Sequence, residues 1–276
     1  MIDLIKKFIK KSFPFRRIFL TMPSRILFGN TISLTNNIKP YFNKTFFFKK
    51  SDYKKTLDSS NNSEIKNLGF KKIKYNLNPK LIKTISDKFE KYILNDSISK
   101  FSTDNKSRYL DSPLRYIPEI NDLEILWKKD AEDFYAGNYR VHSYNGWRIY
   151  SDSSYKEKNK KFLYSNYWHF DDLPKNLLKV FILLSDNVDK NSGATRVIDV
   201  STSKKLTRTF KFVDYALPSI STRMVDEYVY SNNKINYFGG NKGDIYICNT
   251  PRCLHAATIP ENGKIRDLIQ LELLPS

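Results

Sequence analysis

Apolar residues recur at helical spacing in two stretches of the first half of the chain. Before the first stretch, Asn78-Pro79 supplies a helix N-cap and a first-turn proline. Its apolar stripe comprises Ile82, Ile85, Phe89, Tyr92 and Ile93. A second helix is expected from about Asn121 to Tyr135. Its apolar face comprises Leu123, Leu126, Trp127, Ala131 and Phe134. Both stripes predict helices that pack on a core, and we assign them no chemistry.

Beyond the second helix the pattern changes to short strands separated by turn signals. Tyr139–Tyr144, the turn dipeptide Asn145-Gly146 and Trp147–Tyr150 predict a β-hairpin. Gly243-Asp244 followed by Ile245–Cys248 predicts a turn and then a strand. Short strands that recur in this way are typical of jelly-roll domains. We therefore predict a mainly β fold with flanking helices.

Two of the three histidines fit a metal-ligand pattern. His169-Phe170-Asp171 places two ligand side chains on the same face of a strand, because side chains repeat every two residues. His255 would add a third ligand from a neighbouring strand. Two histidines and a carboxylate form the facial triad of non-haem Fe(II) sites, which leaves the opposite metal face open. The alternative is that these groups satisfy ordinary hydrogen bonds, the role expected for the third histidine, His142, in the predicted hairpin.

Arg266 lies eleven residues after His255 and opens the apolar run Leu268–Leu274. Between them, Pro260–Gly263 is a strong turn signal, so we expect a hairpin that returns the arginine towards the metal on the adjacent strand. Arginine suits a carboxylate because its guanidinium makes two parallel hydrogen bonds. A surface ion pair is the default role of a lone arginine, but this position favours carboxylate binding.

With these residues the chain resembles the phytanoyl-CoA dioxygenase family over about residues 68–274. The segments that carry the resemblance are His169-x-Asp171, Lys179–Asp186, Asn191–Val197, Gly243-Asp244, His255 and Arg266. Members of that family are Fe(II)- and 2-oxoglutarate-dependent oxygenases built on a double-stranded β-helix, a cupin-like jelly roll. The resemblance implies that His169, Asp171 and His255 bind iron. It also implies that Arg266 binds the distal carboxylate of 2-oxoglutarate and that O2 is the oxidant.

Two positions depart from the family pattern. Val197–Ser203 replaces a Pro-Gly-Ser-His stretch that many members carry. Ala257 replaces a serine that assists the arginine, which removes one partner of the carboxylate unless Thr258 or another hydroxyl substitutes. Neither departure touches the metal ligands. The presence of Asp171 argues against halogenation, since related halogenases have a small residue there that opens a site for chloride.

The composition agrees with one folded domain of a 276-residue chain that is 40% hydrophobic and 14% aromatic. Residues 51–66 are polar and lack periodicity, so we interpret residues 1–66 as a basic segment with a linker and residues 67–276 as the dioxygenase domain.

Two cysteines, Cys248 and Cys253, do not make a disulfide framework, which favours a reducing, cytoplasmic compartment. A zinc site near His255 is the alternative, but no second Cys/His pair completes four ligands, so we expect these cysteines to fill apolar space.

Most of the positive charge lies at the N-terminus. Residues 1–56 contain 13 Lys or Arg and 2 Asp or Glu, a net charge of +11 out of +18 for the whole chain. Within residues 1–13, isoleucines and a phenylalanine share one helical face against lysines, a pattern typical of an interfacial helix or of a short helix docked on its own domain. Lysines interrupt the apolar run, which excludes a secretory signal, and no stretch reaches the roughly 20 apolar residues of a spanning helix. Peripheral membrane contact is therefore the partner hypothesis for this segment. Nucleic acid is not expected because no recognised motif accompanies the charge.

Together these patterns predict a dioxygenase that hydroxylates a C–H bond of a small molecule and releases succinate and CO2. The lysine-rich segment Ser151–Lys161 and Lys175 suggest an anionic metabolite as the substrate. Two alternatives from other classes stay open. One is a non-catalytic ligand-binding protein on the same scaffold, and the other is an adaptor whose basic N-terminus contacts membrane or nucleic acid. The intact metal ligands favour the enzyme.

Overall fold

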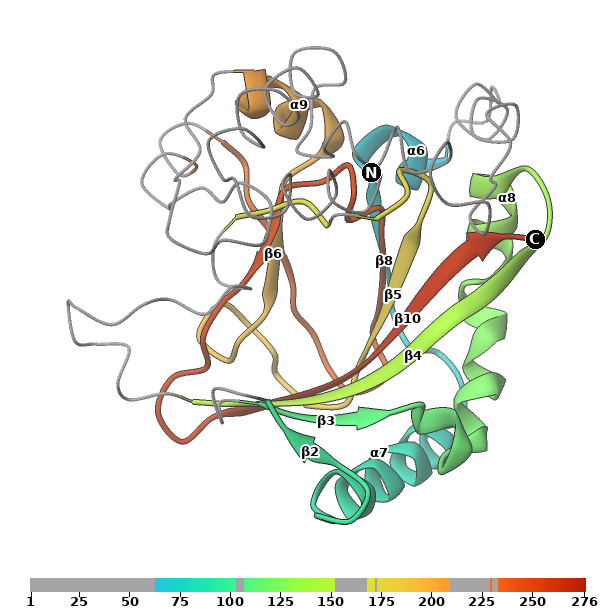
Figure 1. The fold of residues 1–276 in the computed structure, drawn as a ribbon, viewed down its shortest axis with the longest axis vertical. Helices are drawn as coiled ribbons and strands as arrows, with labels where there is room; N and C mark the ends of the chain where they lie inside the picture. The colour runs from blue at the N-terminus through green and yellow to red at the C-terminus, as the bar shows by residue number, and fades with distance from the viewer. Residues whose placement is uncertain (1–62, 103–106, 152–167, 172, 209–228, 230–232) are drawn as a thin grey trace, which may run out of the picture.

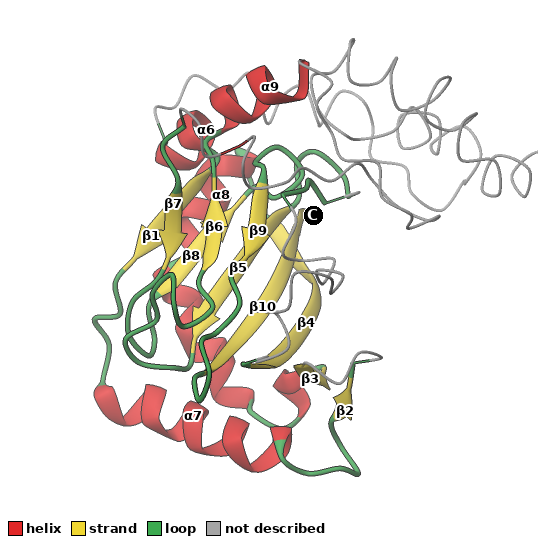
Figure 2. Cartoon of the chain, turned by 90° about the vertical axis from the view of Figure 1, so that its left-hand side faces the viewer, coloured by secondary structure: helices red, strands yellow, loops and turns green. Residues whose placement is uncertain are grey.

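The computed structural model describes residues 63–102, 107–151, 168–171, 173–208, 229 and 233–276. Within these ranges a seven-stranded antiparallel sheet has the order β1-β8-β5-β10-β4-β3-β2, and a three-stranded sheet has the order β7-β6-β9. The strands of the large sheet are β1 (Phe70–Ile73), β2 (Lys100–Phe101), β3 (Ser107–Asp111), β4 (Tyr139–Tyr150), β5 (Leu178–Leu183), β8 (Ile245–Cys248) and β10 (Ile265–Pro275). Those of the small sheet are β6 (Thr195–Val197), β7 (Asn236–Phe238) and β9 (His255–Ala257). The small sheet lies over one face of the large one (Figure 2), which confirms the predicted jelly-roll type of fold.

The helical elements are α6 (Glu64–Leu68), α7 (Pro79–Ile93), η2 (Pro113–Arg115), η3 (Pro118–Leu126), α8 (Lys128–Tyr135) and α9 (Val200–Arg208). The helices α7, η3 and α8 cover the other face of the large sheet, whereas α9 lies on the side of the small sheet (Figure 1). The main hydrophobic core fills the space between α7, η3, α8 and the large sheet, with Phe89 and Phe134 against Ile182 and Ile269. Full burial of each such side chain stabilises the fold by about 1.5–3 kcal/mol. A second apolar cluster, which includes Phe181 and Phe238, lies between the two sheets.

Helix α7 confirms the first predicted helix: the Asn78 side chain accepts a hydrogen bond from the Lys80 amide at 2.9 Å, and Pro79 occupies the first turn. The second predicted helix is wrong in its extent and type. The chain forms a 3-10 helix, η3, from Pro118 and turns into the α-helix α8 only after Trp127. Apolar residues every three positions, Ile117, Ile120 and Leu123, are all fully buried, and a three-residue period suits a 3-10 turn.

The predicted hairpin at Asn145-Gly146 is wrong, because β4 runs unbroken from Tyr139 to Tyr150. Asn145 and Gly146 pair with Gln270 and Ile269 of β10 in the middle of the sheet. Gly146 does not form a turn, and its lack of a side chain allows close packing against a helix. A Cβ at position 146 would lie 2.6 Å from the buried Phe89 ring of α7. A glycine inside a strand often marks such a close approach.

The turn predicted between His255 and Arg266 is present, but the two strands that it connects, β9 and β10, do not pair with each other. Lys264 N donates to Glu261 O at 2.9 Å, and Gly263 has a φ of 82°. Strand β9 pairs with β6 in the small sheet, whereas β10 lies in the large sheet between β5 and β4. The predicted hairpin is therefore corrected to a crossover that places Arg266 on the sheet facing His255.

The last residues of the stretch interpreted as a linker belong to a helix. Helix α6 starts at Glu64 with Ser63 as its N-cap, and Ile65 is 1% exposed within the main core. The boundary near residue 66 stays a prediction, and so does membrane contact by the basic N-terminal segment, of which residues 1–62 lie outside the described residues. Within the described ranges, none of the helices has the length and apolar character needed to cross a bilayer.

Placing an alanine at position 146 should destabilise the protein by about 1–3 kcal/mol, because the new methyl group overpacks a filled site against Phe89. Urea denaturation followed by circular dichroism measures the change in the free energy of unfolding. Gly137→Ala is the matched control, since nothing lies within 4 Å of a Cβ there. Equal stabilities of the two variants would contradict the packing role of Gly146.

Candidate metal centre

Backbone pairing brings the two predicted histidine ligands together. His169 N donates to His255 O, and His255 N donates to His169 O, both at 3.0 Å. His255 is the first residue of β9, which is held in the small sheet through its pairing with Val197 of β6. Asp171 lies two residues after His169, and its amide donates to Thr250 O at 3.4 Å. The local backbone thus orients all three side chains into one site.

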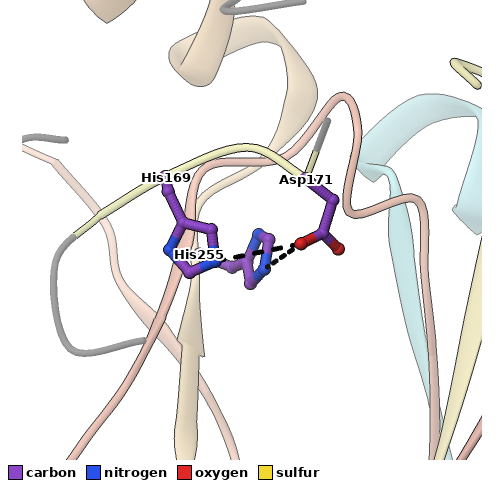
Figure 3. A group of neighbouring side chains, drawn as sticks. All are labelled: His169, Asp171 and His255. Atoms are coloured by element: carbon purple, nitrogen blue, oxygen red, sulfur yellow. Dashed lines mark ion pairs between the residues drawn. The ribbon is translucent and has the colours of Figure 1, made fainter. Parts of the chain in front are cut away.

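The ligand atoms of His169, Asp171 and His255 all lie within 4.8 Å of one another (Figure 3). Asp171 Oδ1 is 3.7 Å from His255 Nε2 and 3.9 Å from His169 Nε2. Two imidazole nitrogens and one carboxylate oxygen are the donor set of non-haem Fe(II) facial triads. Within the described ranges no other group of three His, Cys, Asp or Glu side chains has metal-ligand spacing. The residues therefore fit a single divalent metal ion.

A hydrogen bond fixes the ring of His255 for metal binding. Its Nδ1 lies 3.1 Å from the carbonyl oxygen of Cys253. A carbonyl oxygen only accepts, so Nδ1 carries the proton and Nε2 keeps its lone pair. Ligand histidines commonly donate their second nitrogen in this way, which sets both the tautomer and the ring orientation.

Lys179 of β5 is a site residue that the sequence did not reveal. Its ammonium lies 2.8 Å from Asp171 Oδ2 and 3.6 Å from the carboxylate of Glu272, its cross-strand neighbour on β10. Burial would raise the pKa of Asp171, but Lys179 and the two histidines hold it well below its usual range. The carboxylate is thus ionised, with Oδ2 held by the lysine and Oδ1 directed to the histidines. A lysine within an otherwise apolar strand was the available signal.

Arg266 is 3% exposed and points into the space between the sheets. Its Nη1 donates to the hydroxyl of Thr195 at 3.1 Å, and no carboxylate pairs with it among the described residues. Thr195 is the direct cross-strand partner of Ala257, the position where the family serine is missing. Thr258 does not substitute, because its hydroxyl donates to Ala194 O at 2.8 Å. Thr195 is therefore the hydroxyl that accompanies Arg266, a role set by register that sequence spacing did not show.

Of the other sequence candidates, His142 and the two cysteines lie outside the metal-ligand group that the described residues form. His142 is exposed on β4, as expected for an ordinary strand histidine. Cys248 and Cys253 are fully buried free thiols in apolar surroundings, and neither belongs to the metal-ligand group of the described residues. The lysine-rich segment lies outside the described residues beyond Ser151.

No family model and no curated relative matches this sequence, but solved structures share its fold. One is the α-ketoglutarate-dependent carbocyclase SnoK from nogalamycin biosynthesis, with a TM-score of 0.54 and 14% identity over 76% of this chain and 81% of SnoK. Another is EctD from S. alaskensis with 2-oxoglutarate and 5-hydroxyectoine, with a TM-score of 0.53 and 11% identity over 76% and 73% of the two chains. HygX from Streptomyces hygroscopicus with nickel and 2-oxoglutarate has a TM-score of 0.50 and 13% identity over 77% and 85%. These likenesses support the double-stranded β-helix, while membership of the phytanoyl-CoA dioxygenase family stays a prediction.

The triad should bind one divalent metal ion per chain. Replacing His255 by Ala removes one of three ligands and breaks the site, so Fe(II) or Ni(II) binding measured by anaerobic calorimetry should disappear. His142→Ala is the matched control, because this histidine lies on an exposed face of β4. Unchanged metal stoichiometry in the His255 variant would refute the assignment.

Proposed function

We propose that this protein is an Fe(II)- and 2-oxoglutarate-dependent dioxygenase that hydroxylates a C–H bond of a small molecule. The proposal rests on two features that occur together. One is the triad of His169, Asp171 and His255. The other is the buried Arg266, which has no carboxylate partner among the described residues. 2-Oxoglutarate has a keto-acid end, which a metal ion held by the triad would bind, and a second carboxylate, which a separate cation such as Arg266 would bind. Fe(II) held by His169, Asp171 and His255 would supply, with O2, the oxidative decarboxylation of 2-oxoglutarate to succinate and CO2 and the transfer of oxygen to a substrate.

The position of Arg266 fits the length of this co-substrate. Thr195, which accepts from Arg266, lies two residues along β6 from Val197, the cross-strand partner of His255. Two residues of a strand span about 7 Å. The strand position that contacts Arg266 is therefore separated from the one that pairs with His255 by roughly the length of a five-carbon dicarboxylate.

The electrostatics of Arg266 support anion binding. Burial lowers the pKa of Arg266 to about 10, so the guanidinium is still charged at neutral pH. Its Nε is buried and has no hydrogen-bond partner among the residues that the structure describes. A charged group that is removed from water without a counter-ion is costly, and a bound carboxylate relieves that cost.

The fold neighbours support the co-substrate and leave the reaction type wider than hydroxylation. SnoK is a carbocyclase and SnoN, with a TM-score of 0.54, is an epimerase, both α-ketoglutarate dependent. The carboxylate ligand Asp171, held by Lys179, argues against halogenation, and among the other reactions hydroxylation is the one that we propose. A non-catalytic ligand-binding protein on this scaffold has no need for an ionised, oriented ligand set. The cytoplasmic location and the membrane contact of the basic segment remain hypotheses.

The purified protein should release succinate from 2-oxoglutarate slowly without any added substrate, provided that Fe(II) and O2 are present. His255→Ala should abolish this release, and His142→Ala should leave it at the wild-type rate. Chromatographic quantification of succinate with and without an iron chelator measures the effect. Binding of metal without any succinate formation would favour the non-catalytic alternative.

Replacing Arg266 by Met should weaken 2-oxoglutarate binding by about 3–5 kcal/mol, since the buried charge pair is lost. Thr195→Val should weaken it by only about 0.5–1.5 kcal/mol, because one neutral hydrogen bond is removed. Both variants should still bind iron. Titration of the Fe(II)–2-oxoglutarate charge-transfer absorbance measures the affinities, and an unchanged affinity in the Arg266 variant would place the anchor elsewhere.

A further inference from the structure

Five polar side chains lie side by side on the large sheet next to the metal ligands, and we name them the polar wall. Glu272 of β10 pairs across the sheet with Lys179 of β5 on one side and Ser143 of β4 on the other. Two residues earlier on β10, Gln270 pairs with Asn145. The register therefore gathers these five residues on three adjacent strands.

The polar wall faces the interior between the two sheets. Phe181, two residues from Lys179 on the same face of β5, packs against Phe238 of the small sheet with ring centroids 5.8 Å apart. Lys179 itself reaches Asp171 at 2.8 Å. The alternate residues of β10, Ile269 and Leu271, point the opposite way into the helix-covered core. The polar wall thus lines the interior beside the metal centre.

Several groups of the polar wall have no partner. The Asn145 and Gln270 side chains are half-buried, and neither makes a hydrogen bond within the described part of the chain. The Ser143 hydroxyl is also buried there without a partner. Inner faces of paired sheets normally carry apolar side chains, and buried polar groups are costly unless something satisfies them. Polar groups of this kind beside a metal site indicate a ligand that forms hydrogen bonds.

The polar wall is separate from the 2-oxoglutarate anchor. Gln270 and Glu272 lie four and six residues beyond Arg266 on β10. At about 3.3 Å per residue these positions are roughly 13 and 20 Å from the arginine along the strand. The co-substrate carboxylate and the polar wall therefore occupy opposite ends of the interior.

Chemistry favours hydroxyl groups as the partners of the polar wall. Amide and hydroxyl side chains both donate and accept, as do the hydroxyl groups of a ligand. A phosphate or carboxylate instead calls for a cation, and the one cation of the polar wall, Lys179, is already held by Asp171 and Glu272. The Glu272 carboxylate accepts hydrogen bonds and repels anions.

We infer that the polar wall binds the substrate of the proposed dioxygenase, and that this substrate is a small uncharged molecule with several hydroxyl groups, of the sugar or polyol type. The inference rests on the proposed function, because the metal centre defines where a substrate must lie. It replaces the anionic substrate suggested by the lysine content with one matched to the side chains beside Asp171. Gln270 and Asn145 then orient the hydroxyl groups so that a neighbouring C–H bond faces the metal.

Gln270 is the single glutamine of the chain, so labelling with 15N-glutamine gives one side-chain amide signal within the polar wall. The full chain is loaded with Zn(II), which is diamagnetic, and with 2-oxoglutarate, and is titrated with glucose, myo-inositol or glucose 6-phosphate in the millimolar range. Glucose or myo-inositol should shift the Gln270 amide signal. In an Asn145→Leu variant the shift at equal concentration should fall several-fold, with Ser143→Ala as a second variant if the first does not fold. The exposed substitution Asn67→Leu on α6 is the control and should leave the shift unchanged.

A Gln270 signal that responds to neither neutral compound, or to glucose 6-phosphate alone, would overturn the inference. Its failure is distinguishable from that of the proposed function in the wild-type protein. Succinate release together with an unresponsive amide refutes the polar wall alone. Absence of succinate release refutes the dioxygenase, and a polyol-dependent shift in that case overturns the link between the polar wall and catalysis.

Discussion

The reciprocal hydrogen bonds between the backbones of His169 and His255 are the contact on which the site depends. They connect a short segment that carries two candidate ligands to a strand of the small sheet that carries the third. The same strand fixes the position of Thr195 through β6, and Thr195 in turn accepts from Arg266 of the large sheet. One pair of main-chain contacts therefore relates the candidate metal ligands to the proposed carboxylate anchor across both sheets. Side-chain chemistry at the site follows from backbone pairing of the small sheet.

Features with a local cause could be predicted from the sequence. Helix α7 has its own cap and period, and the His-x-Asp pair needs only the alternation of an extended backbone. The break at Trp127 was missed because 3-10 and α-helical patterns share apolar spacings of three residues. Asn145-Gly146 was wrongly predicted as a turn, because the glycine is needed for close packing against the Phe89 ring of α7. That requirement comes from packing between distant segments, which a local pattern does not contain.

Cross-strand register explains what the sequence left open at the site. Lys179 meets Asp171 only because β5 passes beside the ligand segment, and Thr195 stands beside Arg266 only because β6 pairs with β9. In the family pattern that the sequence resembles, a serine stands at the position of Ala257; in this chain the Thr195 hydroxyl lies directly opposite that position on the neighbouring strand and accepts from Arg266. A side-chain group at one strand position can thus be replaced by the same kind of group at the cross-strand position, because both side chains face the same space. Such an exchange preserves chemistry while it alters the linear motif.

Burial of the Arg266 guanidinium affects both the free energy of folding and the free energy of the proposed co-substrate binding. Removing this cation from water is a cost that the chain meets when the two sheets close around it, long before any keto acid arrives. Under the proposed function, the co-substrate carboxylate would meet a donor that is already dry and oriented, and its own desolvation would be the main term left to offset. It would act as the counter-ion that Arg266 lacks among the described residues. Binding to the native state alone would link occupancy by 2-oxoglutarate to the free energy of unfolding of the domain.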